Sequence, residues 1–421
     1  MSTTLPSTPA SPSPAYEPSA AQRAVIDREL AHSPKNYAPL PLVIDRGEGA
    51  WVWDVDGNRY LDCMAAYSAA NFGHANERFL AAAKAQLERV TITSRALHAT
   101  PLGPFLEALA SLAGKELVLP MNTGAEANET AVKIARKWGY TVKGVAEGRA
   151  KVVAMRKNFH GRTTTMISMS DDPLARENYG PYTPGFELVD FGDVDQLRAA
   201  IDDDTVAVML EPIQGEAGII VPPDGYLQKV RELTRERNVL LVCDEVQTGL
   251  GRTGATFRHQ AEGIEADLIT VGKSLGAGIV PVSAVIGDSD VMGVLAPGTH
   301  GSTFGGNPMA AAIALAVCQE LATGEPQERS RTLGERLHAG LARRVGSGVS
   351  EVRGMGLWAG VDIDPAYGSA KDICLGLLAR GVLAKDTQAR TIRFAPPFVV
   401  GADEIDLLLR EFGAVLDARR P

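Results

Sequence analysis

Residues 239–244 read Val-Leu-Leu-Val-Cys-Asp, five apolar residues followed by a carboxylate. The run Val239–Cys243 is apolar throughout instead of alternating, which is typical of a strand buried on both faces of a parallel sheet. Similar short runs occur at Glu116–Leu119, Lys151–Met155, Thr205–Leu210, Leu268–Val271 and Val282–Ile286. Helical patterns such as Ala127–Lys137 and Asp224–Arg237 lie between them. Strands that alternate with helices predict an α/β fold with a mainly parallel, doubly wound sheet.

The chain on either side of this region divides into segments of different character. A length of 421 residues exceeds a single typical core, so we expect two domains of unequal size. We predict a disordered Ser/Pro-rich tail (1–20), an N-terminal segment that joins the small domain (21–80), a large domain (81–315) and a C-terminal small α+β domain (316–421). A hairpin around Asp56-Gly57 is expected in the second of these segments, because this residue pair is a strong turn signal.

Composition excludes several classes of protein. The formal net charge of -9 argues against a nucleic-acid-binding surface and favours small-molecule substrates. No apolar run reaches about 18 residues, so we expect no membrane span. The four cysteines are far apart and form no C-x-x-C pair, and no metal centre is expected. Cysteine this sparse indicates a reducing compartment, and the tail lacks the features of a secretory signal, so we expect a cytoplasmic protein.

Polar residues follow each of the apolar runs at the point where the strand is expected to end. They are Asn122-Thr123-Gly124-Ala125, Asn158-Phe159-His160-Gly161-Arg162, Glu211, Asp244 and Gly272-Lys273. In open parallel sheets, ligands bind outside the carboxyl ends of the strands. Two carboxylates, a lysine, an arginine and a glycine turn thus meet on one edge of the sheet, which predicts an active site there.

Asp244 and Lys273 occupy positions that are unusual for charged residues. A half-buried carboxylate at residue 244 needs a cationic partner or is driven to protonate. The alternatives are a helix cap or a structural salt bridge. A lysine at a buried strand end has a lowered pKa, which allows the neutral amine to attack a carbonyl. The alternative for Lys273 is a solvated surface lysine.

The turn at residues 122–125 has two compatible interpretations. Exposed backbone amides at a helix N-terminus form an anion site, which Gly124 and Ala125 would supply. Thr123 and Glu126 also have the spacing of a capping box, with the threonine as the cap. Both features can be present together.

Three motifs together resemble the class III aminotransferases. They are Asp244-Glu245-Val246-Gln247-Thr248-Gly249, Arg252-Thr253-Gly254 and Gly272-Lys273. The resemblance runs from about Asn36 to the C-terminus and is greatest to the ornithine-type members of the family. The stretches that carry that finer resemblance are 36–41, 131–140, 211–218, 301–308 and 392–397. It implies the fold type I of enzymes that depend on pyridoxal 5′-phosphate.

The resemblance implies a set of cofactor contacts. Lys273 would hold pyridoxal phosphate as a Schiff base and shuttle a proton, while Asp244 would pair with the pyridine nitrogen. The remaining positions implied are Gln247 at the ring oxygen, Phe159 stacked on the ring, Gly124 and Ala125 at the phosphate, and Thr303 at the phosphate of a neighbouring subunit. The position implied for Thr303 requires at least a homodimer, whereas its plain alternative is a turn hydroxyl. His160 stands where some relatives carry Trp, and we expect it not to touch the core chemistry.

The resemblance also implies a substrate site. It comprises Tyr37, Tyr67, Arg162, Glu211, Glu216 and Arg393. Ornithine reacts at a carbon without a carboxylate, whereas 2-oxoglutarate carries one at its reacting carbon. Glu216 would neutralise Arg393 in the first case and swing away in the second, so that Arg393 clamps the oxoacid. The alternatives are a static Glu216–Arg393 salt bridge and a packing role for Tyr37.

The implied reaction transfers the δ-amino group of L-ornithine to 2-oxoglutarate, giving glutamate 5-semialdehyde, which cyclises to pyrroline-5-carboxylate, and glutamate. Another ω-aminotransferase of the class, acting on N-acetylornithine, 4-aminobutyrate or lysine, is the nearest alternative. A decarboxylase or aminomutase on the same fold would not need the Glu216–Arg393 pair. A non-catalytic scaffold would not need both Lys273 and Asp244.

Overall fold

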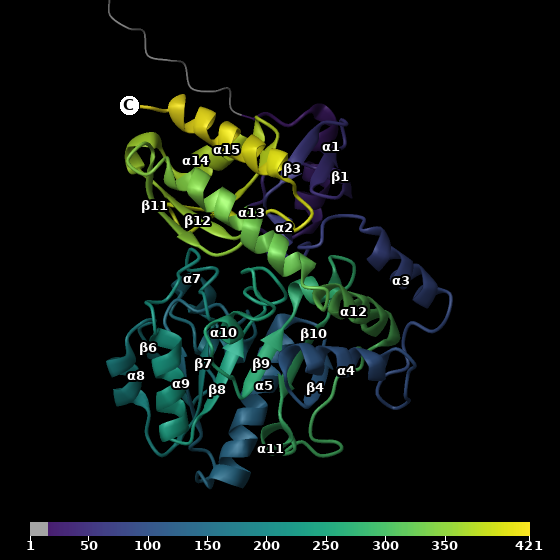
Figure 1. Ribbon diagram of the computed structural model, residues 1–421, viewed down its shortest axis with the longest axis vertical. Helices are drawn as coiled ribbons and strands as arrows, with labels where there is room; N and C mark the ends of the chain where they lie inside the picture. The colour runs from purple at the N-terminus through teal and green to yellow at the C-terminus, as the bar shows by residue number, and fades with distance from the viewer. Residues whose placement is uncertain (1–15) are drawn as a thin grey trace, which may run out of the picture.

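The computed structural model describes residues 16–421, so the greater part of the expected tail, residues 1–15, lies outside the described residues. A large lobe surrounds a seven-stranded sheet, and a smaller lobe contains two four-stranded sheets (Figure 1). This arrangement confirms the predicted α/β class with a parallel-rich large part and a smaller α+β part. Within residues 16–421, no helix is both long and apolar enough to cross a lipid bilayer.

The seven-stranded sheet carries the predicted strands. Its order is β4 (Leu117–Met121), β10 (Ser283–Gly287), β9 (Leu268–Val271), β8 (Leu240–Asp244), β7 (Thr205–Leu210), β5 (Lys151–Met155) and β6 (Phe186–Val189). The five strands from β9 to β6 pair in parallel, and β10 is antiparallel to both of its neighbours. Strand β6 was not predicted, because it is an edge strand of four residues of which only the last is buried.

Helices cover both faces of this sheet. The alternate side chains of β8 show the two layers: Leu240 and Val242 belong to the same cluster as helix α5, whereas Leu241 and Cys243 pack in the cluster that includes the opposite helices. Helix α5 (Gly124–Trp138) covers the first face, and α4 (Leu102–Ala113), α8 (Val194–Ala200), α9 (Tyr226–Glu236) and α12 (Pro308–Leu321) contribute to the second cluster. The sheet is therefore doubly wound, as predicted.

Short helical segments connect these elements. They are α6 (Thr164–Ser168), α7 (Pro173–Arg176), α10 (Arg258–Ala261), α11 (Ser289–Met292), the π-helical turn η1 (Gly139–Lys143) and the 3-10 turn η2 (Lys273–Gly276). Helix α3 (Glu77–Leu87) lies at the side of the molecule in Figure 1, next to α12.

The small lobe contains an antiparallel sheet and three long helices. The sheet order is β11 (Val349–Gly354), β12 (Ala359–Ile363), β15 (Thr391–Phe394) and β14 (Lys385–Thr387). The helices are α13 (Glu325–Ala342), α14 (Ala370–Leu378) and α15 (Ala402–Asp417), and the turn η3 spans Pro365–Tyr367. In Figure 1 these helices lie in the upper part of the molecule, above the seven-stranded sheet.

The N-terminal segment pairs with the C-terminal part of the chain. Helix α1 (Ala20–His32) is followed by β1 (Ile44–Glu48), β2 (Trp51–Asp54), β3 (Arg59–Asp62) and the short segment α2 (Ala65–Ser68). Strand β13 (Val382–Leu383) adds to β3 in parallel. The division into domains remains our proposal. We now place its last boundary in the turn after Leu321, because α12 runs unbroken through residues 315 and 316.

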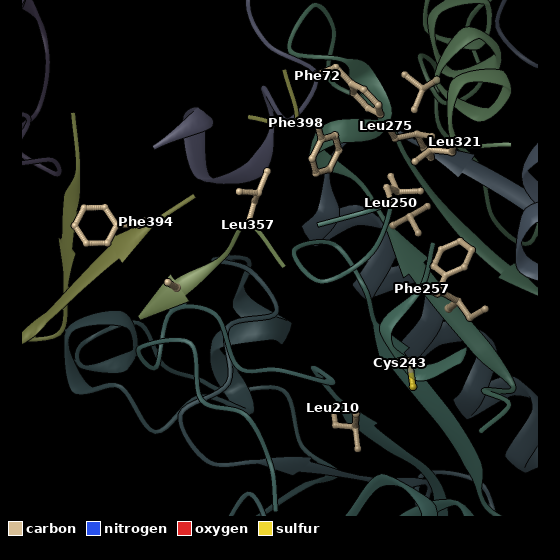
Figure 2. Close-up of a cluster of buried hydrophobic side chains, with 14 of the residues drawn as sticks. Phe72, Leu210, Cys243, Leu250, Phe257, Leu275, Leu321, Leu357, Phe394 and Phe398 are labelled. Carbon is tan, nitrogen blue, oxygen red and sulfur yellow. The ribbon is translucent and has the colours of Figure 1, made fainter. Parts of the chain in front are cut away.

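One continuous apolar cluster links the two lobes. Figure 2 shows it running from Leu210 and Cys243 in the large sheet, past Leu250 and Phe398, to Phe394 in the small lobe. Burial of apolar area on this scale is the main contribution to folding stability. The lobes are therefore joined by a shared core and not only by loops.

Candidate active site

The carboxyl ends of five strands of the large sheet surround one cavity of about 190 Å³. Its lining comprises Gly124, Ala125, Asn128, Phe159, His160, Gly161, Glu211, Asp244, Val246, Gln247 and Lys273. Seven of the residues singled out from the sequence thus line one space, although they lie at or after the ends of five different strands. Gly124 and Lys273 also line a second cavity of about 400 Å³, which Ala69 and the segment 278–282 complete.

Asp244 is held in place by two side chains that lie far from it in the sequence. Its Oδ2 accepts hydrogen bonds from Asn128 Nδ2 and His160 Nδ1, both at 2.7 Å, and its Oδ1 accepts one from the Val246 amide. Asn128 is fixed in turn, because its Oδ1 accepts from the hydroxyl of Thr270. The carboxylate therefore has a fixed orientation at the cavity wall.

The expectation that His160 does not touch the core chemistry is wrong. The ring is buried and contacts Asp244 directly. Burial alone lowers the pKa of His160, but the hydrogen bond to Asp244 and the charges of Asp244 and Glu211 raise it by more, so the pKa lies above its usual value. A protonated His160 would place a positive charge beside the Asp244 carboxylate. A signal for this residue was present, since His160 sits among the polar residues after β5.

Lys273 lies where β9 ends, and its side chain opens on the cavity. Its backbone takes a left-handed conformation with φ 47°, a strained state for a residue with a side chain. Burial lowers the pKa of its amine to about 8, and Arg393 adds to the effect, while Glu216, Asp244 and Glu211 oppose it. Lys273 is thus not a solvated surface lysine, and a large fraction of its amine is neutral near pH 8.

The first turn of α5 shows both of the features expected of it. Thr123 Oγ1 accepts from the Glu126 amide at 3.2 Å, and Glu126 Oε2 accepts from the Thr123 amide at 2.9 Å, which completes a capping box. Within the part of the chain that the structure describes, the amides of Gly124 and Ala125 have no acceptor. These two donors at a helix N-terminus face the cavity and suit an anion.

Glu211 is buried at the end of β7 and is hydrogen bonded to two loops. Its Oε1 accepts from the Phe159 amide at 2.9 Å and its Oε2 from the Gly215 amide at 3.1 Å. Burial raises the pKa of Glu211 to about 7, with His160 lowering it and Asp244 raising it further. Both oxygens are therefore engaged by the protein itself.

Arg393 reaches the same site from strand β15 of the small lobe. Its guanidinium donates to Gln247 Oε1 at 2.8 Å, to Glu216 Oε1 at 3.2 Å and to Ser68 Oγ at 3.2 Å. The arginine is buried, whereas the Glu216 side chain is 30% exposed. Glu216 therefore has space to leave the arginine. The contact at 3.2 Å fits both the switch that the resemblance implied and a static salt bridge, so the role of the pair stays a prediction.

Four predicted residues lie at or beyond the margin of this site in the single chain. The centroid of the Tyr67 ring lies 5.5 Å from Arg393 Cζ. Tyr67 belongs to the segment Ala65–Ser68, whose four residues all have positive φ. Arg162 lies over the Phe159 ring at 5.3 Å and approaches Asp172 at 3.9 Å. Tyr37 is 82% exposed, and Thr303 is exposed too. The structure does not bring Tyr37 or Thr303 into the lining of the cavity.

Comparisons with known proteins agree with this geometry. The family described as aminotransferase class-III matches residues 32–416. An ornithine aminotransferase of Bordetella pertussis is 48% identical over 96% of this chain and 98% of its own length. The ornithine aminotransferase of Bacillus subtilis is 45% identical over 94% of this chain and 98% of its own.

Solved structures of aminotransferases have the same fold as this chain. The crystal structure of the ornithine aminotransferase of Toxoplasma gondii superposes with a TM-score of 0.91 at 42% identity, covering 94% of this chain and 96% of that one. The acetylornithine aminotransferase of Elizabethkingia anophelis follows with a TM-score of 0.85 at 38% identity, covering 94% and 98% of the two chains.

The cofactor of this class, pyridoxal 5′-phosphate, fits the residues that are present. Two amides without acceptors suit its phosphate, and Asp244 suits a protonated ring nitrogen. Gln247 Nε2 is buried and has no hydrogen-bond partner among residues 16–421, which leaves a donor for the ring oxygen. Gly124 stands so close to Val246 that an added Cβ would lie 3.0 Å from it, so the approach to the turn is kept open only by glycine. With the matching family, the relatives and the site all in agreement, the chain belongs to the class III aminotransferases, enzymes that depend on pyridoxal phosphate.

Proposed function

We propose that this enzyme transfers the δ-amino group of L-ornithine to 2-oxoglutarate, giving glutamate 5-semialdehyde, which cyclises to pyrroline-5-carboxylate, and glutamate. The observation that carries the proposal is the buried Arg393 paired with a partly exposed Glu216 beside Lys273. A site for one substrate with a carboxylate at the reacting carbon and another without it needs an arginine whose charge can be masked. The names of the relatives at 45–48% identity support the same choice of donor.

The cofactor contacts follow from the donors and acceptors at the cavity. The amides of Gly124 and Ala125 would bind the phosphate, and Gln247 Nε2 would donate to the ring oxygen. Asp244 would accept from the ring nitrogen, with His160 and Asn128 holding its other oxygen. Phe159 would cover one face of the ring. Pyridoxal phosphate supplies an electron sink that stabilises the carbanion formed when a substrate C–H bond is broken.

Lys273 would then perform the proton transfer. Its amine, with a pKa lowered to about 8, is neutral often enough at neutral pH to accept a proton from the substrate carbon at Nζ. The left-handed backbone at Lys273 fixes where the side chain leaves β9. The same nitrogen would pass that proton on to the cofactor within the same half-reaction, and it would carry a proton in the opposite direction in the other half-reaction.

The substrate contacts would use both lobes. During the ornithine half-reaction, Glu216 neutralises Arg393. The guanidinium then does not compete with Arg162 for the distal carboxylate of ornithine. During the oxoacid half-reaction, Glu216 moves away and Arg393 binds the carboxylate through two parallel hydrogen bonds. Arg162 would bind the distal carboxylate in both halves, with Tyr37 at the α-amino group and Tyr67 at the border of the site.

We further propose that the enzyme is a homodimer in the cytoplasm. Thr303 and the neighbouring Phe304 are exposed in the single chain, Phe304 to 57%. A partner subunit would cover them and bring Thr303 to its own phosphate site. All four cysteines are buried and unpaired, which suits a reducing compartment.

A panel of amino donors with 2-oxoglutarate tests the proposed reaction. L-Ornithine should give glutamate together with pyrroline-5-carboxylate, which is trapped and measured. N-acetylornithine, 4-aminobutyrate and L-lysine should each give much less glutamate, and Lys273→Ala should give none with any donor. If ornithine gives no trapped product while another amine gives glutamate, the assignment to ornithine is wrong and that amine is the donor.

A further inference from the structure

Glu211 connects two loops that carry different parts of the site. It is 3% exposed at the end of β7, and each of its oxygens accepts a backbone amide from a different loop. The Phe159 loop (156–162) follows β5 and carries Phe159, His160 and Arg162. The Glu216 loop (212–218) follows β7 and carries Gly215 and Glu216.

The second of these loops is also closely packed. A Cβ added at Gly215 would lie 2.7 Å from the side chain of Gln247, so the backbone there cannot shift towards the cavity. Gln214 Nε2 donates to the Arg156 carbonyl at 2.7 Å, a second link between the two loops. On its outer side, the Glu216 carbonyl accepts from the small-lobe residues Thr387 and Gln388, at 2.9 Å each.

Only a side chain with two acceptor oxygens at this distance from β7 can hold both amides. A carboxamide of the same size offers one oxygen and would present an N–H group to the other amide, leaving a buried donor without an acceptor. A shorter carboxylate keeps the charge but cannot span the two loops. Because both oxygens of Glu211 are engaged by the backbone, the residue acts through its neighbours and not by touching the substrate.

We propose that Glu211 is a positioning residue that holds the Phe159 loop and the Glu216 loop together and so sets how firmly Glu216 opposes Arg393. This inference rests on the proposed ornithine reaction. It replaces the substrate contact that the sequence predicted for Glu211. When the Glu216 loop is released, Glu216 no longer neutralises the charge of Arg393. The reaction of ornithine, which lacks a carboxylate at its reacting carbon, then becomes less efficient. The oxoacid needs Glu216 to move away, and it is affected much less.

The test compares Glu211→Gln and Glu211→Asp with the wild-type holoenzyme in separate half-reactions above pH 8, where the Glu211 carboxyl, with a pKa of about 7, is mostly ionised. The absorbance of the cofactor follows each half-reaction. Loss of a hydrogen bond to a charged group predicts a fall of about ten- to a hundredfold in kcat/KM for ornithine. The fall for 2-oxoglutarate should stay below about threefold, because that half-reaction requires Glu216 to leave in any case. Glu211→Asp should show the same pattern as Glu211→Gln, a larger fall in kcat/KM for ornithine than for 2-oxoglutarate. It provides a second test if the glutamine variant folds poorly.

Hydrogen exchange of the holoenzymes, measured by mass spectrometry, provides a readout that does not depend on activity. Peptides that contain the amides of Phe159 and Gly215 should exchange faster in both Glu211 variants. Glu404→Gln is the matched control, because Glu404 Oε2 accepts the Gly401 amide at 2.9 Å in the small lobe. It should speed exchange at residue 401 and leave both half-reactions unchanged.

The outcomes separate the inference from the proposed function. Wild-type enzyme that does not react with ornithine overturns the proposed function before any variant is compared, and the exchange experiment then still decides the role of Glu211. Equal losses in the two half-reactions would show a general structural role and overturn the inference. Unchanged exchange at residues 159 and 215 would also overturn it.

Discussion

At Lys273 the chemistry depends on the surroundings of one nitrogen. Burial disfavours the ammonium form, and the charge of Arg393 acts in the same direction, so the pKa of Lys273 falls from 10.5 to about 8. Glu216, Asp244 and Glu211 oppose this shift without cancelling it. A lysine that would be almost wholly charged in water is therefore available as a base and a nucleophile.

The lowered pKa of Lys273 predicts how fast it is labelled in the cofactor-free protein. Reductive methylation requires the neutral amine, so the rate at Lys273 should rise as the pH increases through about 8 and then level off. An ordinary lysine in water is neutral in only about 0.4% of molecules at pH 8, and its rate should continue to rise up to about pH 10. Peptide mass spectrometry measures both rates in one sample. A Lys273 rate that follows the ordinary lysines would contradict the predicted shift.

His160 provides a second prediction at this scale. His160→Phe keeps a ring of similar size but removes the hydrogen bond to Asp244 Oδ2, which leaves Asn128 as the only side-chain donor to that oxygen among the described residues. A hydrogen bond to a charged group contributes about 1.5–3 kcal/mol, so kcat/KM should fall by about tenfold or more. Steady-state kinetics with saturating cofactor measures the change.

His338→Phe is the matched control for that experiment. His338 is a partly buried histidine of α13 that bonds the Gly356 carbonyl at 3.1 Å and does not line the cavity. Its replacement should leave kcat/KM within about twofold of the wild type, because surface and remote changes act mainly on stability. If the two variants lose activity to the same extent, the contact of His160 with Asp244 has no special part in catalysis.

Among the secondary-structure elements, helix α5 and the loop after β5 depend on each other. The first turn of α5 keeps two amides free because Thr123 and Glu126 satisfy each other in the capping box. The loop passes so close to this turn that a Cβ at Gly161 would lie 2.8 Å from the Cβ of Ala125. Gly161 also has a φ of +137°, a backbone conformation that residues other than glycine avoid.

The prediction at this scale is that Gly161→Ala lowers both stability and cofactor affinity. The strained backbone and the contact with Ala125 together should cost about 2–3 kcal/mol of unfolding free energy. Because the clash pushes on the turn that offers the phosphate-binding amides, the dissociation constant of pyridoxal phosphate should rise as well. Urea unfolding and titration of the cofactor-free protein measure these two quantities.

Gly148→Ala separates the contribution of the backbone from that of the contact. Gly148 also has a positive φ, of 78°, but an added Cβ there meets nothing within 4 Å. It should cost about 1 kcal/mol of stability and leave cofactor affinity unchanged. Equal effects of the two replacements on cofactor binding would argue against the coupling between the loop and α5.

The elements show which parts of the fold the sequence could predict. Strands β5, β7 and β9 were predicted with their observed bounds, because nearly all residues of a strand buried on both faces are apolar. The edge strand β6 was missed, because its first three side chains are only partly buried and it lacks a clear apolar run. A run of apolar residues indicates a buried strand, and the side chains of an edge strand are less buried.

Site residues that belong to short sequence motifs were predicted, whereas contacts between residues far apart in the sequence were missed. Lys273, Asp244 and Gln247 belong to short runs with recognisable spacing. Asn128 is 116 residues away from Asp244 in the sequence, and only the packing of α5 against the sheet brings them together. The one sequence signal for Asn128 was a polar residue on the mostly apolar buried face of a helix, where Thr130 is the other polar residue.

Across the whole molecule, the site is built from both lobes. Arg393, Thr387 and Gln388 come from the small lobe, and the last two donate to the Glu216 carbonyl, whereas Lys273 and Asp244 come from the large one. Arg252 strengthens the junction: it is fully buried and donates to the carbonyls of Leu357 at 2.7 Å and Pro396 at 2.8 Å, and to the side chain of Asn71. Its guanidinium thus joins the large sheet to the N-terminal segment and the small lobe.

The proposed dimer leads to the prediction at the largest scale. Thr303 is exposed and absent from the cavity of its own chain, so we expect it to serve the phosphate of the partner subunit. Thr303→Ala alone should weaken cofactor binding by about tenfold, the usual loss for one hydrogen bond to a charged group. Lys273→Ala alone should abolish activity. Neither variant by itself tells which subunit Thr303 serves.

Hybrid dimers decide the question. When one subunit carries Thr303→Ala and the other Lys273→Ala, a threonine that acts across the interface leaves one site fully intact. The purified hybrid should then have about half the activity of a wild-type dimer at limiting pyridoxal phosphate, because the second site carries both defects. If Thr303 served its own chain, the site with the intact lysine would lack the threonine, and the hybrid would bind cofactor as weakly as the Thr303→Ala homodimer. Differently tagged subunits, refolded together and purified by both tags, provide the hybrid, and a cofactor titration of its activity distinguishes the two cases.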